Sequence, residues 1–487
     1  MTSFFNSVLA NNMGRRILEE YSILGNKVSI IDDDGRGLYI VEKKKSDNTE
    51  QNIVNSILDE VYFSSKTTTE AESKLIEIIT KKNLDRSLTE KAMYELKKKL
   101  LYDEITVPIS DPDIEEIECM GPGLPITVIH RKYSNYIRLY TNIVINREEE
   151  ILKIIEKLAT RASKSVSIAK PYLEFSLPEG HRVAATISNE ISNPGSTFDI
   201  RKFPVSPISL VELIKSNSLS VEMASYLWLL MEYKPFYLIV GSTGSGKTTM
   251  LNALLNFTSP DSKILSIEDT PELNLIGKNW IRFFSRQSLA STYDVSIGDL
   301  SRLALRYRPD YLIIGEVRGK EIETLIHASS SGHGSFSTFH GGKPSDVVTR
   351  VVSLLPKELA IMFLNSIWGF ILVGRRLSDG KVIKAINAIY ETQKTNGKIR
   401  FKRILWYSFK TKRYEPNDFS KILKTSEKLK YIQTTYGYRE SDLLNELNKR
   451  KQFLTNLIDS NIVDNGVIQE EIGKFYRGMS IYATATI

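Results

Sequence analysis

The chain has 487 residues, of which 41% are hydrophobic and 25% charged, as expected for a globular protein with two or three domains. Its single cysteine, Cys119, excludes an intramolecular disulfide and a cysteine-built zinc site, and predicts a reducing, cytoplasmic compartment. The net charge of +7 permits contact with an anionic surface without requiring it, and no apolar stretch is long enough to span a bilayer.

The first residues predict a helical start to an α+β domain that covers residues 1–203. One face of this helix carries the apolar residues Phe4, Phe5, Val8, Leu9 and Met13. That face is expected to pack on the domain's own core, with docking on a partner or on lipid headgroups as the alternative. Two apolar runs around Asp34-Gly35 then predict a hairpin. Two helices follow, the second beginning at a capping box led by Ser87.

From residue 114 the pattern changes to short strands, interrupted by a helix over 148–162. The predicted strands are 114–120, 126–130, 137–145, 172–177, 183–187 and 197–203. Strands mixed with a few helices, without a phosphate loop, indicate an α+β module. Pro204 and Pro207 mark the expected linker, 204–210.

The segment GSTGSGKT, residues 241–248, matches the phosphate-loop pattern G-x-x-x-x-G-K-[ST]. It follows an apolar run over 236–240 and precedes a helical segment over 248–255, which is the strand–loop–helix setting that such a loop needs. Lys247 is expected to reach the β- and γ-phosphates of ATP, and the Thr248 hydroxyl to bind Mg²⁺. The candidate nucleotide-binding residues are Gly241, Ser242, Thr243, Gly244, Ser245, Gly246, Lys247, Thr248 and Thr249.

Further apolar runs alternate with helices over 211–390, which predicts a mostly parallel sheet covered by helices. Three of these strands, at 263–267, 311–314 and 335–339, run directly into charged residues or histidine. In open α/β sheets ligands bind outside the carboxyl ends of the strands, so these groups are expected to converge on the phosphate loop. They are Glu268, Asp269, Glu272, Glu316, Arg318 and His340. Residues 391–487 complete a hairpin and form a helical extension, to which we assign no chemistry.

Taken in order, these blocks resemble one family. IEDTPEL (267–273), LRYRPDYLIIGEVRG (305–319) and SGHGSFSTFH (331–340) are similar to the Asp box, Walker B block and His box of the secretion ATPases. These are the motors of type II secretion, type IV pilus and archaellum machines, and the chain most resembles the archaeal branch. LPEGHRVAATISNE (177–190) and TFDIRKF (197–203) resemble the nucleotide-facing edge of the family's N-terminal domain.

The resemblance implies a RecA-like phosphate-loop motor domain preceded by an α+β domain, assembled as a ring-shaped homo-hexamer. Each active site would lie between the N-terminal domain of one subunit and the motor domain of the same and neighbouring subunits. Such proteins hydrolyse ATP with Mg²⁺ and act on a polytopic membrane platform protein. The expected location is the cytoplasm, peripheral at the inner face of the cell membrane, with no membrane span and no specific nucleic acid partner.

Hydrolysis needs compensation of the γ-phosphate charge and a water aimed in line. Glu316 is the natural water-polarising or Mg²⁺-organising carboxylate, with the Asp box as a second acidic group. Gly315 stands where many phosphate-loop enzymes carry the Mg²⁺-holding Asp, so the division of roles between Glu316 and the Asp box stays open. Arg182 and Arg201 are candidates for arginines that act on a neighbouring subunit's phosphate, and Arg318 is expected to pair with Glu316 or to reach the subunit boundary.

Two other classes of function compete with a filament or secretion motor. A nucleic-acid translocase would share the phosphate loop, but no helix-turn-helix or RNA-binding signature is visible. A nucleotide-sensing scaffold is disfavoured by the intact Lys247, Thr248 and Glu316. The motifs do not distinguish pilus, archaellum and secretion motors, and a pilus-like surface filament is the expectation we adopt.

Overall fold

The structure, a computed structural model, describes residues 15–483 except 44–47, 66, 168, 204–206, 278, 287–293, 318, 320, 379–380 and 396–397. The predicted N-terminal helix over residues 4–13 lies outside the described residues. The chain divides into two compact units, Met1–Val205 and Ser206–Ile487, and this division falls within the predicted linker 204–210.

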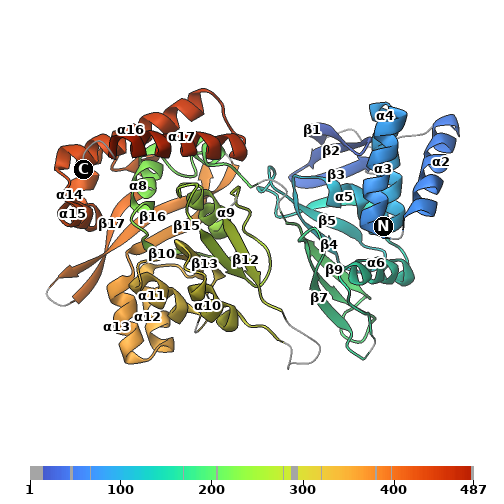
Figure 1. The fold of residues 1–487 in the computed structure, drawn as a ribbon. Helices are drawn as coiled ribbons and strands as arrows, with labels where there is room; N and C mark the ends of the chain where they lie inside the picture. The colour runs from blue at the N-terminus through green and yellow to red at the C-terminus, as the bar shows by residue number, and fades with distance from the viewer. Residues whose placement is uncertain are drawn as a thin grey trace. The chain divides into compact units, whose positions relative to one another are not determined.

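The first unit is built on a nine-stranded sheet in the order β1-β2-β3-β6-β5-β4-β9-β8-β7 (Figure 1). Neighbouring strands are antiparallel except β3 and β6, which are parallel. The strands are β1 Arg15–Ile23, β2 Asn26–Asp33, β3 Arg36–Glu42, β4 Ile114–Cys119, β5 Pro125–His130, β6 Leu139–Val144, β7 Tyr172–Ser176, β8 Arg182–Thr186 and β9 Thr197–Arg201. The hairpin at Asp34-Gly35 is confirmed by β2 and β3, and the predicted strands from residue 114 onward are present within one or two residues.

The helices of the first unit depart from prediction in number and in one boundary. They are α2 Asn48–Ser64, α3 Thr68–Lys82, α4 Arg86–Lys97, α5 Thr106–Ser110 and α6 Glu148–Arg161, with the π-helical turn Lys98–Tyr102 and the 3₁₀ turn Asp103–Ile105 between α4 and α5. Three helices, not two, fill the stretch after the hairpin. The prediction that Ser87 begins α4 is wrong, because Asp85 is the N-cap and accepts a hydrogen bond from Leu88 N at 2.7 Å. Asp caps a helix as well as Ser does, and the earlier position leaves Ser87 inside the first turn.

The second unit contains another nine-stranded sheet, in the order β12-β11-β13-β14-β10-β15-β16-β17-β18. The strands are β10 Phe236–Gly241, β11 Ile264–Glu268, β12 Trp280–Phe284, β13 Tyr311–Glu316, β14 Gly334–His340, β15 Gly369–Ser378, β16 Lys381–Thr395, β17 Lys398–Ser408 and β18 Arg413–Glu415. Strands β10 to β15 are parallel, as predicted, and β16 to β18 continue the sheet in antiparallel pairing. The predicted C-terminal hairpin is therefore part of the same sheet as the phosphate loop's strand.

Helices cover both faces of this second sheet. They are α7 Leu210–Lys215, α8 Val221–Met231, α9 Lys247–Leu255, α10 Ile297–Arg306, α11 Ile322–Ser330, α12 Pro344–Leu354, α13 Lys357–Ser366, α14 Phe419–Thr425, α15 Glu427–Tyr436, α16 Glu440–Asp459 and α17 Asn465–Ala483. Along β10, Tyr237 and Ile239 pack with residues of α8, α9 and α16, whereas Phe236, Leu238 and Val240 pack with residues of α11 and α13. Because both faces of β10 are covered, its sequence is continuously apolar. The whole chain is thus a mixed α/β protein with two large sheets.

In the described part of the chain, no helix has both the length and the apolarity needed to cross a bilayer. The longest helix, α16, carries charged residues along its length and one buried arginine.

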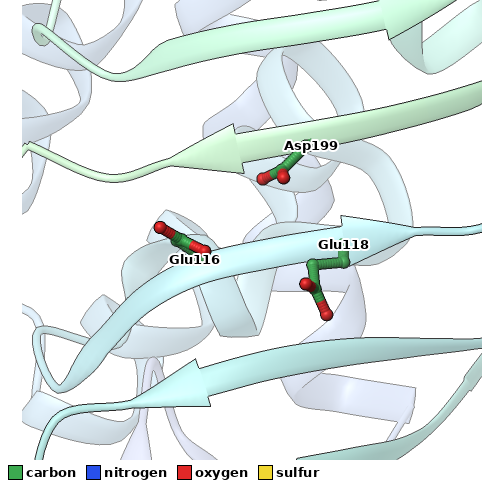
Figure 2. Close-up of side chains that lie close together, drawn as sticks. All are labelled: Glu116, Glu118 and Asp199. Carbon is green, nitrogen blue, oxygen red and sulfur yellow. The ribbon is translucent and has the colours of Figure 1, made fainter. Parts of the chain in front are cut away.

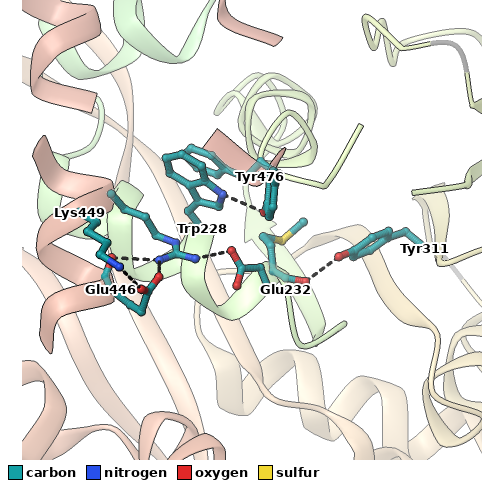
Figure 3. A network of polar contacts seen from close by, with 9 residues as sticks. Trp228, Glu232, Tyr311, Glu446, Lys449 and Tyr476 are labelled. Carbon is teal, nitrogen blue, oxygen red and sulfur yellow. Dashed lines mark hydrogen bonds and ion pairs between the residues drawn. The ribbon is translucent and has the colours of Figure 1, made fainter. Parts of the chain in front are cut away.

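That buried residue, Arg450, ties α16 to α8. It is fully buried, donates from Nη1 to Glu446 Oε2 at 2.6 Å and forms an ion pair with Glu232, which directly follows α8 (Figure 3). Burial raises the pKa of Glu232, and the guanidinium of Arg450 opposes this shift. Alongside, Trp228 Nε1 donates to the Tyr476 hydroxyl at 2.9 Å, which attaches α17 to the same helix.

Replacing Arg450 with Met should lower the free energy of unfolding of the second unit by about 3–5 kcal/mol, because Glu232 would lose its buried counter-charge. Urea denaturation followed by circular dichroism measures this. The matched control is Lys449→Met on the same helix, whose side chain is 62% exposed although it also pairs with Glu446. It should change stability by less than about 1 kcal/mol. Equal effects of the two substitutions would contradict the assigned role of Arg450.

Candidate functional site

The phosphate loop connects β10 to α9, and its glycines are required by the backbone. Gly244 and Gly246 have φ values of +67° and +89°, in the left-handed region that favours glycine. A Cβ on Gly241 would lie 2.4 Å from the carbonyl oxygen of Val373 on β15. The helix begins at Lys247, directly after the loop, so its first N–H groups and its positive dipole end face the loop.

Lys247 links the loop to the ends of two neighbouring strands. Its Nζ donates to Ser242 O at 3.0 Å and lies 3.5 Å from His340 Nδ1. The other ring nitrogen of His340, Nε2, lies 2.7 Å from Glu316 Oε1. The loop lysine, the histidine after β14 and the glutamate at the end of β13 therefore form a continuous polar chain.

A second chain joins the loop to the acidic segment after β11. The Thr248 hydroxyl donates to Glu272 Oε2 at 2.8 Å. Glu272 N and Leu273 N both donate to Glu268 Oε1 at 2.9 Å, so Glu268 fixes the turn that presents Glu272. Of the predicted acidic residues, Glu272 and not Glu268 contacts the loop in this structure.

Glu268 occupies the space that Gly315 leaves free. The Glu268 side chain is buried, and a Cβ on Gly315 would lie 3.1 Å from Glu268 Cγ. Burial raises the pKa of Glu268 to about 7, against the opposing effect of the two N–H groups that it accepts. Asp269, by contrast, is exposed and accepts a hydrogen bond from Ser285 Oγ at 2.6 Å. The absence of a side chain at Gly315 is thus matched by a buried carboxyl group from the adjacent strand.

The two predicted N-terminal arginines lie on neighbouring strands of the first unit. Arg182 on β8 and Arg201 on β9 are directly opposite each other in the register. Arg182 forms an ion pair with Glu174, and both side chains of this pair are solvent-accessible. Like charges in opposite positions repel each other, so this arrangement favours a bound anion. Arg318, the third predicted arginine, lies outside the described residues.

Three carboxylates, Glu116, Glu118 and Asp199, lie together on β4 and β9 next to Arg201 (Figure 2). Burial raises the pKa of Asp199 to about 6, with smaller contributions in the same direction from Glu116 and Glu118. Neither strand end nor motif singled out this acidic group in the sequence. Its physical effect is to place negative charge beside Arg201 on the polar face of the first sheet.

Two cationic residues beside the phosphate loop were missed by the sequence analysis. Arg375 Nε donates to Gly244 O at 3.1 Å, and the side chain of Lys384 covers Gly246. Arg375 lies near the carboxyl end of β15, next to β10 in the parallel part of the sheet. The strand-end rule that selected the other candidates would have selected it if the run ending at Gly374 had been assigned to this sheet.

Comparison with known proteins connects this site to one family. The family model for type II/IV secretion system proteins matches residues 125–384. An uncharacterized protein of Methanocaldococcus jannaschii is 33% identical over 394 residues, which cover 80% of this chain and 70% of that protein. The conjugal transfer protein TrbB of Rhizobium radiobacter is 29% identical over 41% of this chain and 61% of its own. The protein VirB11 of Agrobacterium fabrum is 37% identical over 24% of this chain and 35% of its own.

The buried carboxyl group of Glu268 should make the stability of the second unit depend on pH. Its folded-state pKa of about 7 lies above the ordinary value of 4.5, so the native state holds the proton more tightly than the unfolded chain. The resulting stabilisation is complete below about pH 4.5 and is lost as the pH rises through about 7. Glu268→Gln keeps the oxygen that accepts the two N–H groups and cannot ionise.

Between pH 5 and 7.5 the wild-type chain should lose stability relative to Glu268→Gln, by an amount up to about 3 kcal/mol. Urea denaturation of the nucleotide-free chain at several pH values measures the difference. Asp269→Asn, which removes an exposed neighbouring carboxylate, is the control. A stability difference that stays constant over this pH range would show that Glu268 does not titrate there.

Proposed function

Because the chain belongs to the family of type II/IV secretion system proteins, we propose that it is an ATP-hydrolysing motor. It works as a ring-shaped homo-hexamer with a RecA-like motor domain, and powers assembly of a type IV-pilus-like surface filament or type II-like secretion. Its partner is a polytopic membrane platform protein, and it is a cytoplasmic protein, peripheral at the inner face of the cell membrane. An archaellum motor is the alternative within this class.

The observation that carries the proposal is the convergence of two polar chains on one loop. Lys247, His340 and Glu316 form one chain, and Thr248 and Glu272 the other. In a loop of this kind, Lys247 neutralises the β- and γ-phosphates while the backbone N–H groups hold them. Glu316, held by His340, then orients the attacking water in line with the γ-phosphate. A scaffold that only senses nucleotide has no need of this second group.

The residues present also fit the predicted cation. The Thr248 hydroxyl and a Glu272 carboxylate oxygen lie 2.8 Å apart at the loop, and hard oxygen ligands of this kind suit Mg²⁺. Glu316 supplies a further carboxylate from the adjacent strand end. Mg²⁺ bound there neutralises charge that develops on the phosphate oxygens. The structure thereby supports a division of roles in which Glu268 shapes the Asp-box turn and Glu272 serves the cation.

A nucleic-acid translocating ring ATPase remains the second candidate, and the name of one relative favours it. TrbB of Rhizobium radiobacter is called a conjugal transfer protein. An ATPase rate that DNA stimulates, with a steep dependence on salt concentration, would favour this function over the filament or secretion motor. Stimulation by membranes containing the platform protein, but not by DNA, would favour the motor.

Two substitutions should separate nucleotide binding from hydrolysis. Lys247→Ala removes the charge that faces the phosphates, so both binding and turnover should be lost. Glu316→Gln keeps the shape of the side chain and loses the carboxylate, so binding should persist while kcat falls by about a hundredfold or more. Fluorescent-nucleotide titration and phosphate release measure the two quantities, with the exposed Lys410→Ala as control. Near wild-type turnover of Glu316→Gln would refute its assigned role.

Arginines supplied across the subunit boundary are expected to act on the neighbouring phosphate. In a closed ring each interface joins two different patches, so one subunit can supply the loop and the next the arginine. Arg182→Ala or Arg201→Ala should lower turnover by about a thousandfold or more and leave ATP binding largely intact. Arg147→Ala, at a 72% exposed arginine of the same unit, is the matched control.

Mixing either arginine variant with Lys247→Ala subunits should recover part of the activity, although each variant is inactive alone. Some mixed interfaces then combine an intact loop with an intact arginine. ATPase rate is measured against mixing ratio after subunit exchange, which labelled subunits verify. A flat baseline at every ratio in exchanged rings would place these arginines within their own subunit's site, or in a purely structural role.

A further inference from the structure

The hairpin formed by β15 and β16 lies against the phosphate loop, although it follows the loop by more than a hundred residues in the sequence. Arg375 on β15 and Lys384 on β16 are opposite each other in the antiparallel register, so their side chains share one face of the sheet. This face carries both contacts with the loop, one at Gly244 and one at Gly246. The loop is therefore supported from outside by two cationic side chains of its own chain.

The contact of Arg375 is specific to the loop's conformation. Its Nε donates to the Gly244 carbonyl at 3.1 Å, and a Cβ on Gly244 would lie 2.5 Å from Arg375 Nη2. Gly244 is thus restricted to glycine twice, by its φ of +67° and by the arginine packed on it. Similarly, a Cβ on Gly246 would lie 2.9 Å from Lys384 Cβ, so the stem of Lys384 closes the other glycine.

We propose that Arg375 is a positioning residue of the nucleotide site, acting within the subunit that carries the loop. By holding the Gly244 carbonyl on the side of β15, it favours the loop conformation in which the backbone N–H groups face the phosphates. Its guanidinium also adds positive charge beside the loop. The ligand it serves is the β-phosphate, which ADP and ATP share and AMP lacks. This inference rests on the proposed binding of ATP.

A positioning role differs in its consequences from a role in folding or in the chemical step. Arg375 is exposed, so its neutralisation removes little buried surface and should leave thermal stability unchanged. It restrains the loop in the same way before and during hydrolysis. Because such a restraint supports the ground state and the transition state equally, its loss weakens binding and leaves kcat nearly unchanged.

The test is Arg375→Gln in the full-length chain, titrated with fluorescent ADP, ATP and AMP. A hydrogen bond to a charged group contributes on the order of tenfold in affinity, so Kd for ADP and for ATP should each rise roughly tenfold. The Kd for AMP, kcat at saturating ATP and Tm should be unchanged. Arg413→Gln, which removes the same charge from an exposed arginine on β18 of the same sheet, should alter none of these values.

A double-mutant cycle with Gly244→Ala provides a second measurement. In the wild-type chain this substitution strains the backbone and also displaces Arg375, whereas in the Arg375→Gln chain only the backbone strain remains. The loss of ADP affinity from Gly244→Ala should therefore be smaller in the Arg375→Gln chain. Strictly additive losses would contradict the contact between these residues as the source of the effect.

The other outcomes separate this inference from the proposed function. If Lys247→Ala abolishes ADP binding while Arg375→Gln leaves it unchanged, the proposed function stands and the role of Arg375 is refuted. A fall in kcat with unchanged Kd would also refute it, because Arg375 would then act in the transition state. A wild-type chain that binds neither ADP nor ATP would overturn the proposed function and this inference together.

Discussion

The parallel pairing of β10 between β14 and β15 is the constraint on which the site depends. Parallel strands end at a common edge, and here the register places Gly241 beside His340 on one side and close to the Val373 carbonyl on the other. A side chain at Gly241 would collide with that carbonyl, so the strand can end at this point only in glycine. The same pairing brings Lys247 within reach of His340 and lets Arg375 contact the loop.

Charge in the site is arranged around one buried carboxyl group. Glu268 uses one oxygen to accept two backbone N–H groups, and its burial favours the protonated form near neutral pH. Its place beside Gly315 leaves two less buried acidic groups, Glu272 and Glu316, on separate polar chains. This separation gives the loop two acidic groups with different neighbours, a hydroxyl in one case and a histidine in the other.

The first unit brings a different kind of charge. Its sheet buries the apolar side of β4, β8 and β9, so the opposite side carries Arg182 and Arg201 with the carboxylates of Glu116, Glu118 and Asp199. Repulsion between the arginines is offset in part by these acids. Such a face is suited to receive a further anion without requiring a change in its own backbone, which is the property that an arginine acting on a neighbouring subunit needs.

The sequence by itself determined the phosphate loop, the acidic and histidine-bearing strand ends and most of the strands, because these depend on local patterns: glycine spacing, apolar runs and the residues that follow them. It did not determine that α4 begins at Asp85, that Glu268 turns inward while Glu272 meets Thr248, or that Arg375 contacts Gly244. Those features arise from pairing between segments far apart in the chain. Only the tertiary structure decided them, because strand register and burial, not local pattern, fix which side chains meet.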